Sequence, residues 1–285
     1  MEKEKREHKL KSLNALCVRL VFCLYAEDAG IFGEKRNMFH DYLARYEARD
    51  CRRALIELFK VLDTEEEDRE DYLEEELAQF PYVNGGLFAD ESVEIPQFTE
   101  EIRELLLTKA SEEFNWKDIS PTIFGAVFES TLNPETRRHG GMHYTSIENI
   151  HKVIDPLFLD ELQEEFETIQ AYKTLNVKRK KLMDFQEKLA HLKFLDPACG
   201  SGNFLTETYL SLRRLENKVL RVLYGEGQGV LGVAASDIIK VSIQQFYGIE
   251  INDFAVTVAK TALWIAESQM LDETKNIIYG LDGDF

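Results

Sequence analysis

The stretch FLDPACGSGNFL, residues 194–205, places a short apolar run directly before glycines, a serine and an asparagine. A pattern typical of an amphipathic helix follows at once. A tight turn from strand to helix brings backbone N–H groups and the positive end of the helix next to a ligand. Glycines let that ligand approach without a Cβ in between. The stretch therefore predicts a strand, a ligand-binding glycine loop and a helix.

Strand patterns occur only in the last third of the chain. LKFLD at residues 192–196 is the first, residues 244–251 form the second, and NIIYG at residues 276–280 is a candidate third. Helical patterns cover about residues 203–222 and 253–270 between them. Strands that alternate with helices in this order are typical of a parallel, doubly wound sheet.

The earlier part of the chain has helical spacing of its apolar residues. Thr99 is a good N-cap, and FPYVNGGLFADESVEIPQF at residues 80–98 predicts a turn-rich surface segment. Ser146 is a second candidate N-cap. We therefore expect a mainly α-helical domain over residues 1–118. A partial α/β, Rossmann-like domain is expected over residues 119–285.

Composition limits the partners and the compartment. The 285 residues hold 34 Lys and Arg against 52 Asp and Glu, a net charge of −18, so the average field repels nucleic acid. A DNA contact would need a local basic patch such as residues 178–181 or Arg137-Arg138. The four cysteines form no CxxC pair, and Arg19 interrupts the only apolar run near the start. This favours a reduced, bacterial-type cytoplasmic protein without a signal peptide or a membrane span.

Three familiar loops do not fit the glycine stretch. A dinucleotide loop needs a small residue where Leu205 stands, a P-loop needs a following lysine, and a nucleophile elbow needs a glycine at Cys199. A nucleoside ligand without phosphates remains. Glu250, at the end of the second strand, can accept hydrogen bonds from both ribose hydroxyls. Together Asp196 and Glu250 suit the positive sulfonium of S-adenosylmethionine.

On these residues the chain resembles a known family. DPACGSGNFL is similar to motif I of amino-methylating DNA methyltransferases, FYGIEIN to motif II, and GGMHYTS to motif X, upstream as in adenine-N6 enzymes of the gamma arrangement. The wider stretch at residues 120–162 resembles the MmeI-like enzymes, which fuse nuclease, helical spacer, methyltransferase and target-recognition domains. LNALCVRLVFCLYAEDAGIF and FPYVNGGLF are similar to their helical spacer.

The resemblance implies S-adenosylmethionine as cofactor and duplex DNA as the partner of a full-length parent that methylates adenine N6 for restriction-modification. Tyr144, Thr145 and Ser146 would flank the methionyl end, although the family more often has proline in place of Ser146. The amino-acid and sulfonium part would be lined by Asp196, Ala198, Gly200 and Gly202, with Asn203 starting the next helix. Glu250 would hold the ribose, and Ile251 would lie against adenine. A parent nuclease would need Mg²⁺.

The family's Asn/Asp/Ser-Pro-Pro-Tyr/Phe motif, which holds the flipped base, is missing from the sequence. We therefore expect a piece of a longer protein, with no catalytic residue of its own, weak cofactor binding at most and no methylation. No metal site is expected either. Two alternatives stay open, a non-catalytic scaffold or DNA-binding module and a nucleotide-dependent oxidoreductase. The sequence assigns neither Asp282 nor Asp284 to the site, and it does not give the recognised DNA sequence or the oligomeric state.

Overall fold

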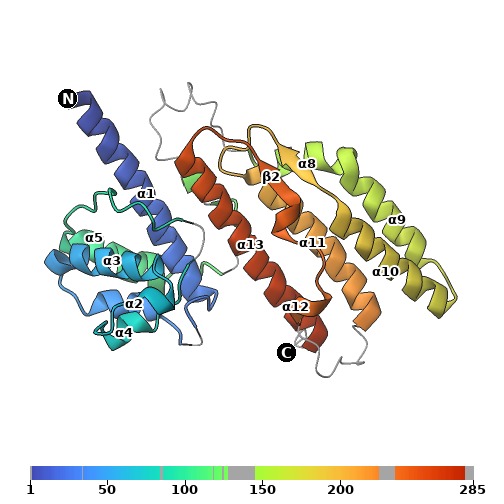
Figure 1. Ribbon diagram of the computed structural model, residues 1–285, viewed down its shortest axis with the longest axis horizontal. Helices are drawn as coiled ribbons and strands as arrows, with labels where there is room; N and C mark the ends of the chain where they lie inside the picture. Colours follow the sequence, from blue (N-terminus) through green and yellow to red (C-terminus); the bar gives the residue numbers. More distant parts are fainter. Residues whose placement is uncertain are drawn as a thin grey trace. The chain divides into compact units, whose positions relative to one another are not determined.

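The computed structural model describes residues 2–33, 35–83, 86–117, 119–123, 125–127, 145–224 and 235–279. The chain divides into two compact units, Met1–Met142 and His143–Phe285, and each is described by itself below (Figure 1). The division falls where residues are not described, so the domain boundary expected between residues 118 and 119 stays a prediction.

The first unit consists of helices, in agreement with the sequence. Its elements are α1 (Glu2–Asp28), α2 (Met38–Ala44), α3 (Ala48–Leu62), a 3-10 turn (Glu66–Asp68), α4 (Glu75–Ala78), α5 (Glu100–Glu104) and the π-helical η2 (Leu105–Glu112) (Figure 1). The predicted cap of α5 is confirmed, because the Thr99 hydroxyl accepts a hydrogen bond from the Ile102 N–H.

A buried arginine joins α1 to a distant segment in this unit. Arg19 is only 4% exposed, and its guanidinium lies over the rings of Phe59 and Phe88. It donates hydrogen bonds to the carbonyl oxygens of Leu87 at 2.8 Å and Asp90 at 3.0 Å. A buried charge is tolerated only when its hydrogen bonds are satisfied, so this arginine fixes the path of the chain near residue 88.

The prediction of a surface segment at residues 80–98 is wrong for its apolar residues. Buried here are Phe80, Val83, Leu87 and Phe88. The Val83 N–H also donates to the Leu62 carbonyl oxygen at 2.8 Å, which ties the segment to the end of α3. Turn residues set the direction of the backbone, but the apolar side chains between them enter the core because their burial lowers the free energy of the folded state.

The second unit combines helices with two short strands. Its helices are α8 (Ile147–Ile154), the π-helical η3 (Asp155–Leu159), α9 (Asp160–Gln170), α10 (Leu175–His191), α11 (Asn203–Tyr224), α12 (Ala235–Ile238), the 3-10 turn η4 (Ile243–Gln245) and α13 (Asp253–Tyr279). The strands are β1 (Phe194–Asp196) and β2 (Phe246–Gly248). The Ser146 cap is confirmed, since its hydroxyl accepts a hydrogen bond from the Asn149 N–H.

The two strands pair in parallel, with Phe194 opposite Phe246, and α11 belongs to the crossover between them. The two phenylalanine rings stack at 5.2 Å on the packed face of the sheet. On the other face Leu195 is 63% exposed and Tyr247 is 47% exposed. Within the described residues the sheet is therefore buried on one face only, whereas parallel sheets are normally covered on both.

The predicted third strand is wrong. The first four residues of NIIYG, residues 276–279, continue α13, and the fifth lies outside the described residues. Met270, Thr274, Ile277 and Ile278 are buried at helical spacing. The isoleucines favour a strand locally, but the long contact between α13 and α11 decides for the helix.

Helix α11 is the centre of the second unit and carries a buried ion pair. Arg213 and Glu216 lie on successive turns, are 1% and 0% exposed, and contact each other directly. The Glu216 carboxylate also accepts hydrogen bonds from the Gln186 side chain of α10 and from the Lys240 N–H, both at 2.7 Å. Arg213 donates to the Thr274 hydroxyl of α13 at 2.7 Å. One ion pair thus connects three segments.

We expect Glu216→Ala to cost about 3–5 kcal/mol of unfolding free energy, because it leaves the Arg213 guanidinium buried without its anion. Urea denaturation followed by circular dichroism measures this loss. The matched control is Glu113→Ala, which removes the exposed partner of Lys109 and should change stability by less than about 1 kcal/mol. Equal effects of the two substitutions would contradict a central role for the buried pair.

Candidate functional site

The glycine loop follows β1 directly and is tied to the end of β2 by the backbone. The Asp196 carbonyl oxygen accepts from the Ile249 N–H at 2.9 Å, and the Cys199 N–H donates to the Ile249 carbonyl oxygen at 3.1 Å. The Asp196 side chain closes a turn by accepting from the Ala198 N–H at 3.0 Å. With α11 beginning at Asn203, the predicted order of strand, glycine loop and helix is confirmed.

The two loop glycines have different surroundings. Both adopt positive φ angles, 53° for Gly200 and 79° for Gly202, which favour glycine. A Cβ on Gly202 would lie 2.7 Å from the Ala259 Cβ of α13, whereas a Cβ on Gly200 would meet nothing within 4 Å. Gly202 is therefore required for packing of the loop against α13, and Gly200 is the glycine with open space beside it.

Glu250 joins the strand ends through its carboxylate. One oxygen accepts from the Gly200 N–H at 3.0 Å, and the other accepts from the Asn252 N–H at 2.9 Å. Each carboxylate oxygen has a further acceptor position, so two more donors can bind the same side chain. The side chain is half-buried at the edge where the parallel strands end. This is the edge at which open α/β sheets bind ligands.

The thiol of Cys199 is a packing group here. A Cβ on Gly248 would lie 2.6 Å from its Sγ, so the side chain lies directly against β2. Burial raises the pKa of Cys199, and the negative charges of Asp196 and Glu250 raise it further. The protonated thiol is a poor nucleophile. The same two carboxylates create a negative potential that favours a cation at the loop.

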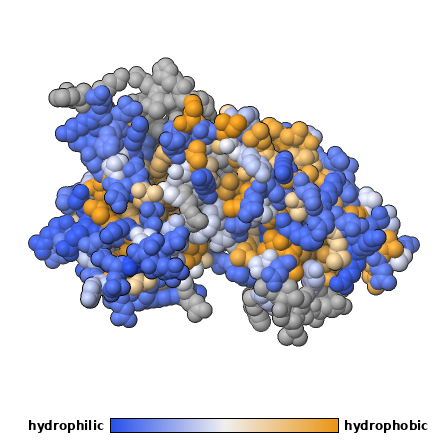
Figure 2. All heavy atoms as spheres, viewed as in Figure 1, coloured by the Kyte–Doolittle hydropathy of each residue, from blue (hydrophilic) through white to orange (hydrophobic). Residues whose placement is uncertain are grey.

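Apolar side chains surround this edge of the sheet. Exposed are Leu195, Tyr247, Ile249 and Ile251, the last of them at 95%. Figure 2 shows apolar surface over the part of the second unit where Figure 1 places β2 and α8. Ile251 follows Glu250 directly, so an apolar group could contact it while a polar group binds the carboxylate.

The start of α11 supplies hydrogen-bond donors and one buried acceptor. Asn203 is 7% exposed, and its Oδ1 has no hydrogen-bond partner among the described residues. The first backbone N–H groups of a helix have no partner within the helix and carry partial positive charge. The predicted contacts Asp196, Ala198, Gly200, Glu250 and Ile251 thus meet at one edge, with Gly202 and Asn203 buried beneath them.

The predicted contacts upstream of α8 are only partly described. Thr145 and Ser146 are half-buried at the start of α8, whereas Tyr144 lies outside the described residues. Helix α8 packs against α11, and Ile150 between them is fully buried. Two helices whose first residues are candidate ligand contacts are therefore in direct contact with each other.

A group that the sequence did not single out joins these two helices. His151 of α8 lies 2.7 Å from the Asp155 carboxylate and 3.2 Å from the Glu207 carboxylate of α11. Glu207 is 2% exposed and also pairs with Arg214 at 3.2 Å. A lone histidine in a helix gives no recognisable signal in the sequence, because its partner is distant along the chain.

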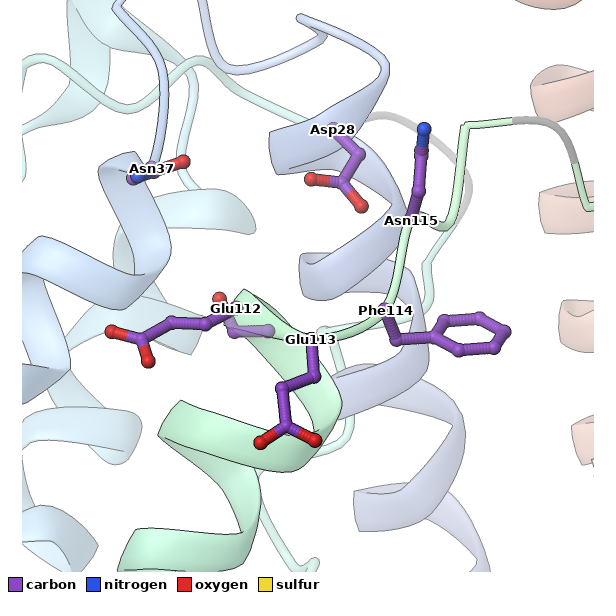
Figure 3. A pocket seen from close by; sticks show the side chains of 7 residues that line it. Asp28, Asn37, Glu112, Glu113, Phe114 and Asn115 are labelled. Carbon is purple, nitrogen blue, oxygen red and sulfur yellow. The ribbon is translucent and has the colours of Figure 1, made fainter.

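A second candidate location is a hollow of about 350 Å³ in the first unit. It is lined by Asp28, Asn37, Ser111, Glu112, Glu113, Phe114 and Asn115 (Figure 3). Its acids have structural partners: Asp28 accepts from the Trp116 N–H at 2.7 Å, and Glu113 pairs with Lys109 at 2.6 Å. Among the described residues no group of acids, histidines or cysteines is arranged to hold a metal ion. Asp28 therefore fastens the end of α1 to the chain that follows η2, whereas the Glu113 pair stays within the end of η2.

Comparison with known proteins matches both units. The family profile described as "MmeI, DNA-methyltransferase domain" matches residues 172–281, and that described as "MmeI, helicase spacer domain" matches residues 11–88. DNA methyltransferase A of Bacillus subtilis is 42% identical over 94% of this chain and 29% of its own length. The structure of the type IIL restriction-modification enzyme MmeI in complex with DNA matches with a TM-score of 0.77 and 42% identity, over 94% of this chain and 34% of that chain.

The chain belongs to the MmeI family. The resemblance found in the sequence motifs is confirmed, both for the methyltransferase part and for the spacer. This member spans less than a third of the length of DNA methyltransferase A and about a third of the MmeI chain. No helix in the described part of this MmeI-family chain is long and apolar enough to cross a membrane.

The His151 contacts predict a pH-dependent stability for this MmeI-family chain. Hydrogen bonding to Asp155 raises the pKa of His151 above its usual value; burial opposes this shift, and hydrogen bonding to Glu207 adds to it. A raised pKa in the folded state means that this stabilisation is complete below about pH 6.5, the unfolded value, and is lost as pH rises through the folded value.

We expect His151→Gln to destabilise the chain at pH 6 and to have less effect at pH 9. Urea denaturation at both pH values measures the difference between the two proteins. The matched control is His191→Gln at the end of α10, an exposed histidine whose ring contacts the Glu187 carbonyl oxygen at 2.7 Å and not a carboxylate; its effect should be small and alike at both pH values. A difference between wild type and His151→Gln that does not change with pH would show that the ion pair contributes nothing.

Proposed function

We propose that this chain is the cofactor-binding part of a DNA methyltransferase that transfers a methyl group from S-adenosylmethionine to adenine N6. The observation that carries the proposal is the position of Glu250. Its carboxylate joins the glycine loop after β1 to the end of β2 and retains acceptor positions for two hydroxyl groups. Membership of the MmeI family supports a DNA methyltransferase of a restriction-modification system as the full-length protein.

The carboxylates of Asp196 and Glu250 and the open backbone at Gly200 suit this cofactor. S-adenosylmethionine supplies an electrophilic methyl group on a sulfonium ion. Glu250 would accept hydrogen bonds from the ribose hydroxyls, and Gly200 would let the cofactor approach the backbone. The carboxylates of Asp196 and Glu250 favour the cationic sulfonium over a neutral thioether. Product with its neutral sulfur would lose that attraction, which favours its release after transfer.

The remaining predicted contacts complete the site. The amino-acid part would lie near Ala198 and the start of α11 at Asn203, with Tyr144, Thr145 and Ser146 at the methionyl end. Ile251 would contact the adenine ring, and burial of an isoleucine side chain contributes about 1.5–3 kcal/mol. Gly202 would let the loop pack closely on α13, because a Cβ at this position would lie 2.7 Å from the Ala259 Cβ.

We also propose that residues 119–285 belong to a Rossmann-like domain and residues 1–118 to a helical spacer. The parallel pair β1–β2 with α11 in its crossover is one unit of such a sheet. The exposed face with Leu195 and Tyr247 then becomes an internal surface of the complete domain. Duplex DNA would be the partner of the full-length protein.

The chain by itself is expected not to methylate DNA. The sequence lacks the Asn/Asp/Ser-Pro-Pro-Tyr/Phe motif that would accept hydrogen bonds from the adenine amine and stack on the flipped base. Methyl transfer forms a bond from N6 to the methyl carbon, breaks the bond from that carbon to sulfur, and releases a proton from N6. A group that holds N6 is therefore needed in addition to the cofactor site.

Isothermal titration calorimetry tests the cofactor assignment. We expect S-adenosylmethionine to bind more tightly than S-adenosylhomocysteine, and both to bind more tightly than NAD, because the loop has Leu205 where a dinucleotide loop needs a small residue. Tighter binding of NAD would reverse the assignment in favour of an oxidoreductase. Absence of binding by all three ligands would support a scaffold.

Substitution of Glu250 tests the ribose contact. We expect Glu250→Gln to weaken binding of S-adenosylhomocysteine about 10- to 100-fold, because a hydrogen bond to a charged group contributes about 1.5–3 kcal/mol. Titration calorimetry measures both affinities. The matched control is Glu164→Gln on α9, which removes one exposed carboxylate far along the sequence and should leave the affinity unchanged.

Glu250 also holds the loop, so a second ligand separates the two roles. Wild type should lose affinity for an S-adenosylhomocysteine analogue without ribose hydroxyls, whereas Glu250→Gln should bind the two ligands with more nearly equal affinity. Equal discrimination by both proteins would mean that Glu250 only supports the loop, and the ribose assignment would be wrong.

A further inference from the structure

The connection between α9 and α10 carries an isolated group of cations. We call residues 172–181, YKTLNVKRKK, the hairpin tip. Its five basic residues are Lys173, Lys178, Arg179, Lys180 and Lys181, and no acid occurs among the ten. The whole chain has the opposite balance, with a net charge of −18. In Figure 1, α9 and α10 lie side by side as a helical hairpin, and α10 leads directly to β1.

These cations have no ion-pair partner among the described residues. Lys173, Arg179 and Lys180 are exposed, and Lys181 lies 5.0 Å from the centre of the Tyr172 ring. Farther along the same hairpin the pattern differs, because Lys188 of α10 pairs with Glu165 of α9 at 2.6 Å. Acidic partners thus exist on α9, but they neutralise α10 only away from the tip.

The position of the cations is unfavourable for the helix itself. Helix α10 begins at Leu175 without any acid in its first turn, and four consecutive cations follow from Lys178 to Lys181. The N-terminus of a helix carries partial positive charge over its first turn, so Lys178 at the end of that turn destabilises the helix by about 0.3–1 kcal/mol. Lys178 and Lys181, three positions apart, are neighbours on the helix surface, and like charges at such a spacing repel each other. Neither effect is offset by an ion pair, which indicates an anion from outside the described residues.

The tip also exposes apolar side chains among its charges. Leu175 is 80% exposed, Val177 is 42% exposed and Tyr172 is 40% exposed. A solvated helix face would instead carry mixed charges of both signs, as the spacer helices of this chain do with their exposed pairs Arg53–Glu57 and Lys109–Glu113.

We propose that the hairpin tip binds the sugar-phosphate backbone of duplex DNA. This inference rests on the proposed function, because it assigns a surface for the proposed substrate. Duplex DNA presents one negative charge per about 1.7 Å of its axis, which suits a compact group of Lys and Arg in an otherwise acidic chain. Contacts to phosphates position a protein on DNA without reading its sequence.

The helix geometry limits the number of contacts. Consecutive helical residues are rotated by about 100°, so Lys178 to Lys181 point in different directions and cannot all face one duplex. We infer about two or three phosphate contacts, one of them from Lys173 in the connection. Arg179 lies roughly 18 Å along α10 from His191 at its end, at about 1.5 Å per residue. The tip would therefore hold DNA that flanks the target base.

The test is fluorescence anisotropy of a labelled 20-base-pair duplex, titrated with the chain between about 25 and 200 mM KCl. The variant is the triple substitution Lys173→Gln, Arg179→Gln and Lys180→Gln. We expect its affinity to fall about tenfold or more at low salt. The slope of log affinity against log salt should become less negative by about 2, since each lost phosphate contact contributes about 0.9.

The control removes the same charge elsewhere. Lys5→Gln, Lys9→Gln and Lys11→Gln, all on α1, should leave both the affinity and the slope at the wild-type values. The tip variant should also unfold at the same or a higher urea concentration than wild type, because the three substituted side chains are exposed and lie in no ion pair within the described residues. A loss of DNA binding then cannot be assigned to misfolding.

The outcomes separate this inference from the proposed function. Equal slopes for tip variant and wild type, or no binding of the duplex by wild type, would overturn it. So would tip-dependent binding to phosphatidylserine vesicles without binding to the duplex. The tip variant should keep the wild-type affinity for S-adenosylmethionine. Tip-dependent DNA binding without any cofactor binding would sustain the inference and reject the cofactor assignment.

Discussion

The second unit depends on one constraint, which is that the ends of β1 and β2 and the glycine loop are held together by Glu250 and by backbone hydrogen bonds. Glu250 accepts from Gly200 and Asn252, while Ile249 exchanges two hydrogen bonds with the loop. The loop also packs through Gly202 against Ala259 and through Cys199 against β2. A carboxylate that accepts backbone N–H groups can therefore define a ligand site and also fix the conformation that the ligand meets.

Helix α11 connects this loop to the other helices of the unit. Its first residue follows the loop, Glu207 contacts His151 of α8, and Glu216 binds α10 and the segment before β2. Buried ion pairs of this kind add little net stability compared with apolar packing, but they accept only one arrangement of their partners. We infer that these pairs specify how the helices around the candidate site align.

Much of the candidate site could be predicted because it is local in sequence. The run from Phe194 to Leu205 contains its own strand, turn and helix signals, and Glu250 follows from the next strand. The prediction failed where distant contacts override local preference. Residues 276–279 look like a strand but extend α13 along α11, and the turn-rich segment near Phe88 enters the core of the first unit.

The sequence by itself determined the order of strand, glycine loop and helix and pointed to the family, because glycines, caps and apolar spacing act within a few residues. Only the tertiary structure decided which loop glycine is open, since Gly202 is blocked by Ala259, which is distant along the chain. It alone also paired His151 with Glu207, and within the described residues it left the cations of the hairpin tip without ion-pair partners while Lys188 pairs with Glu165. Packing and Coulomb energies depend on distance in space, and a sequence does not contain that distance.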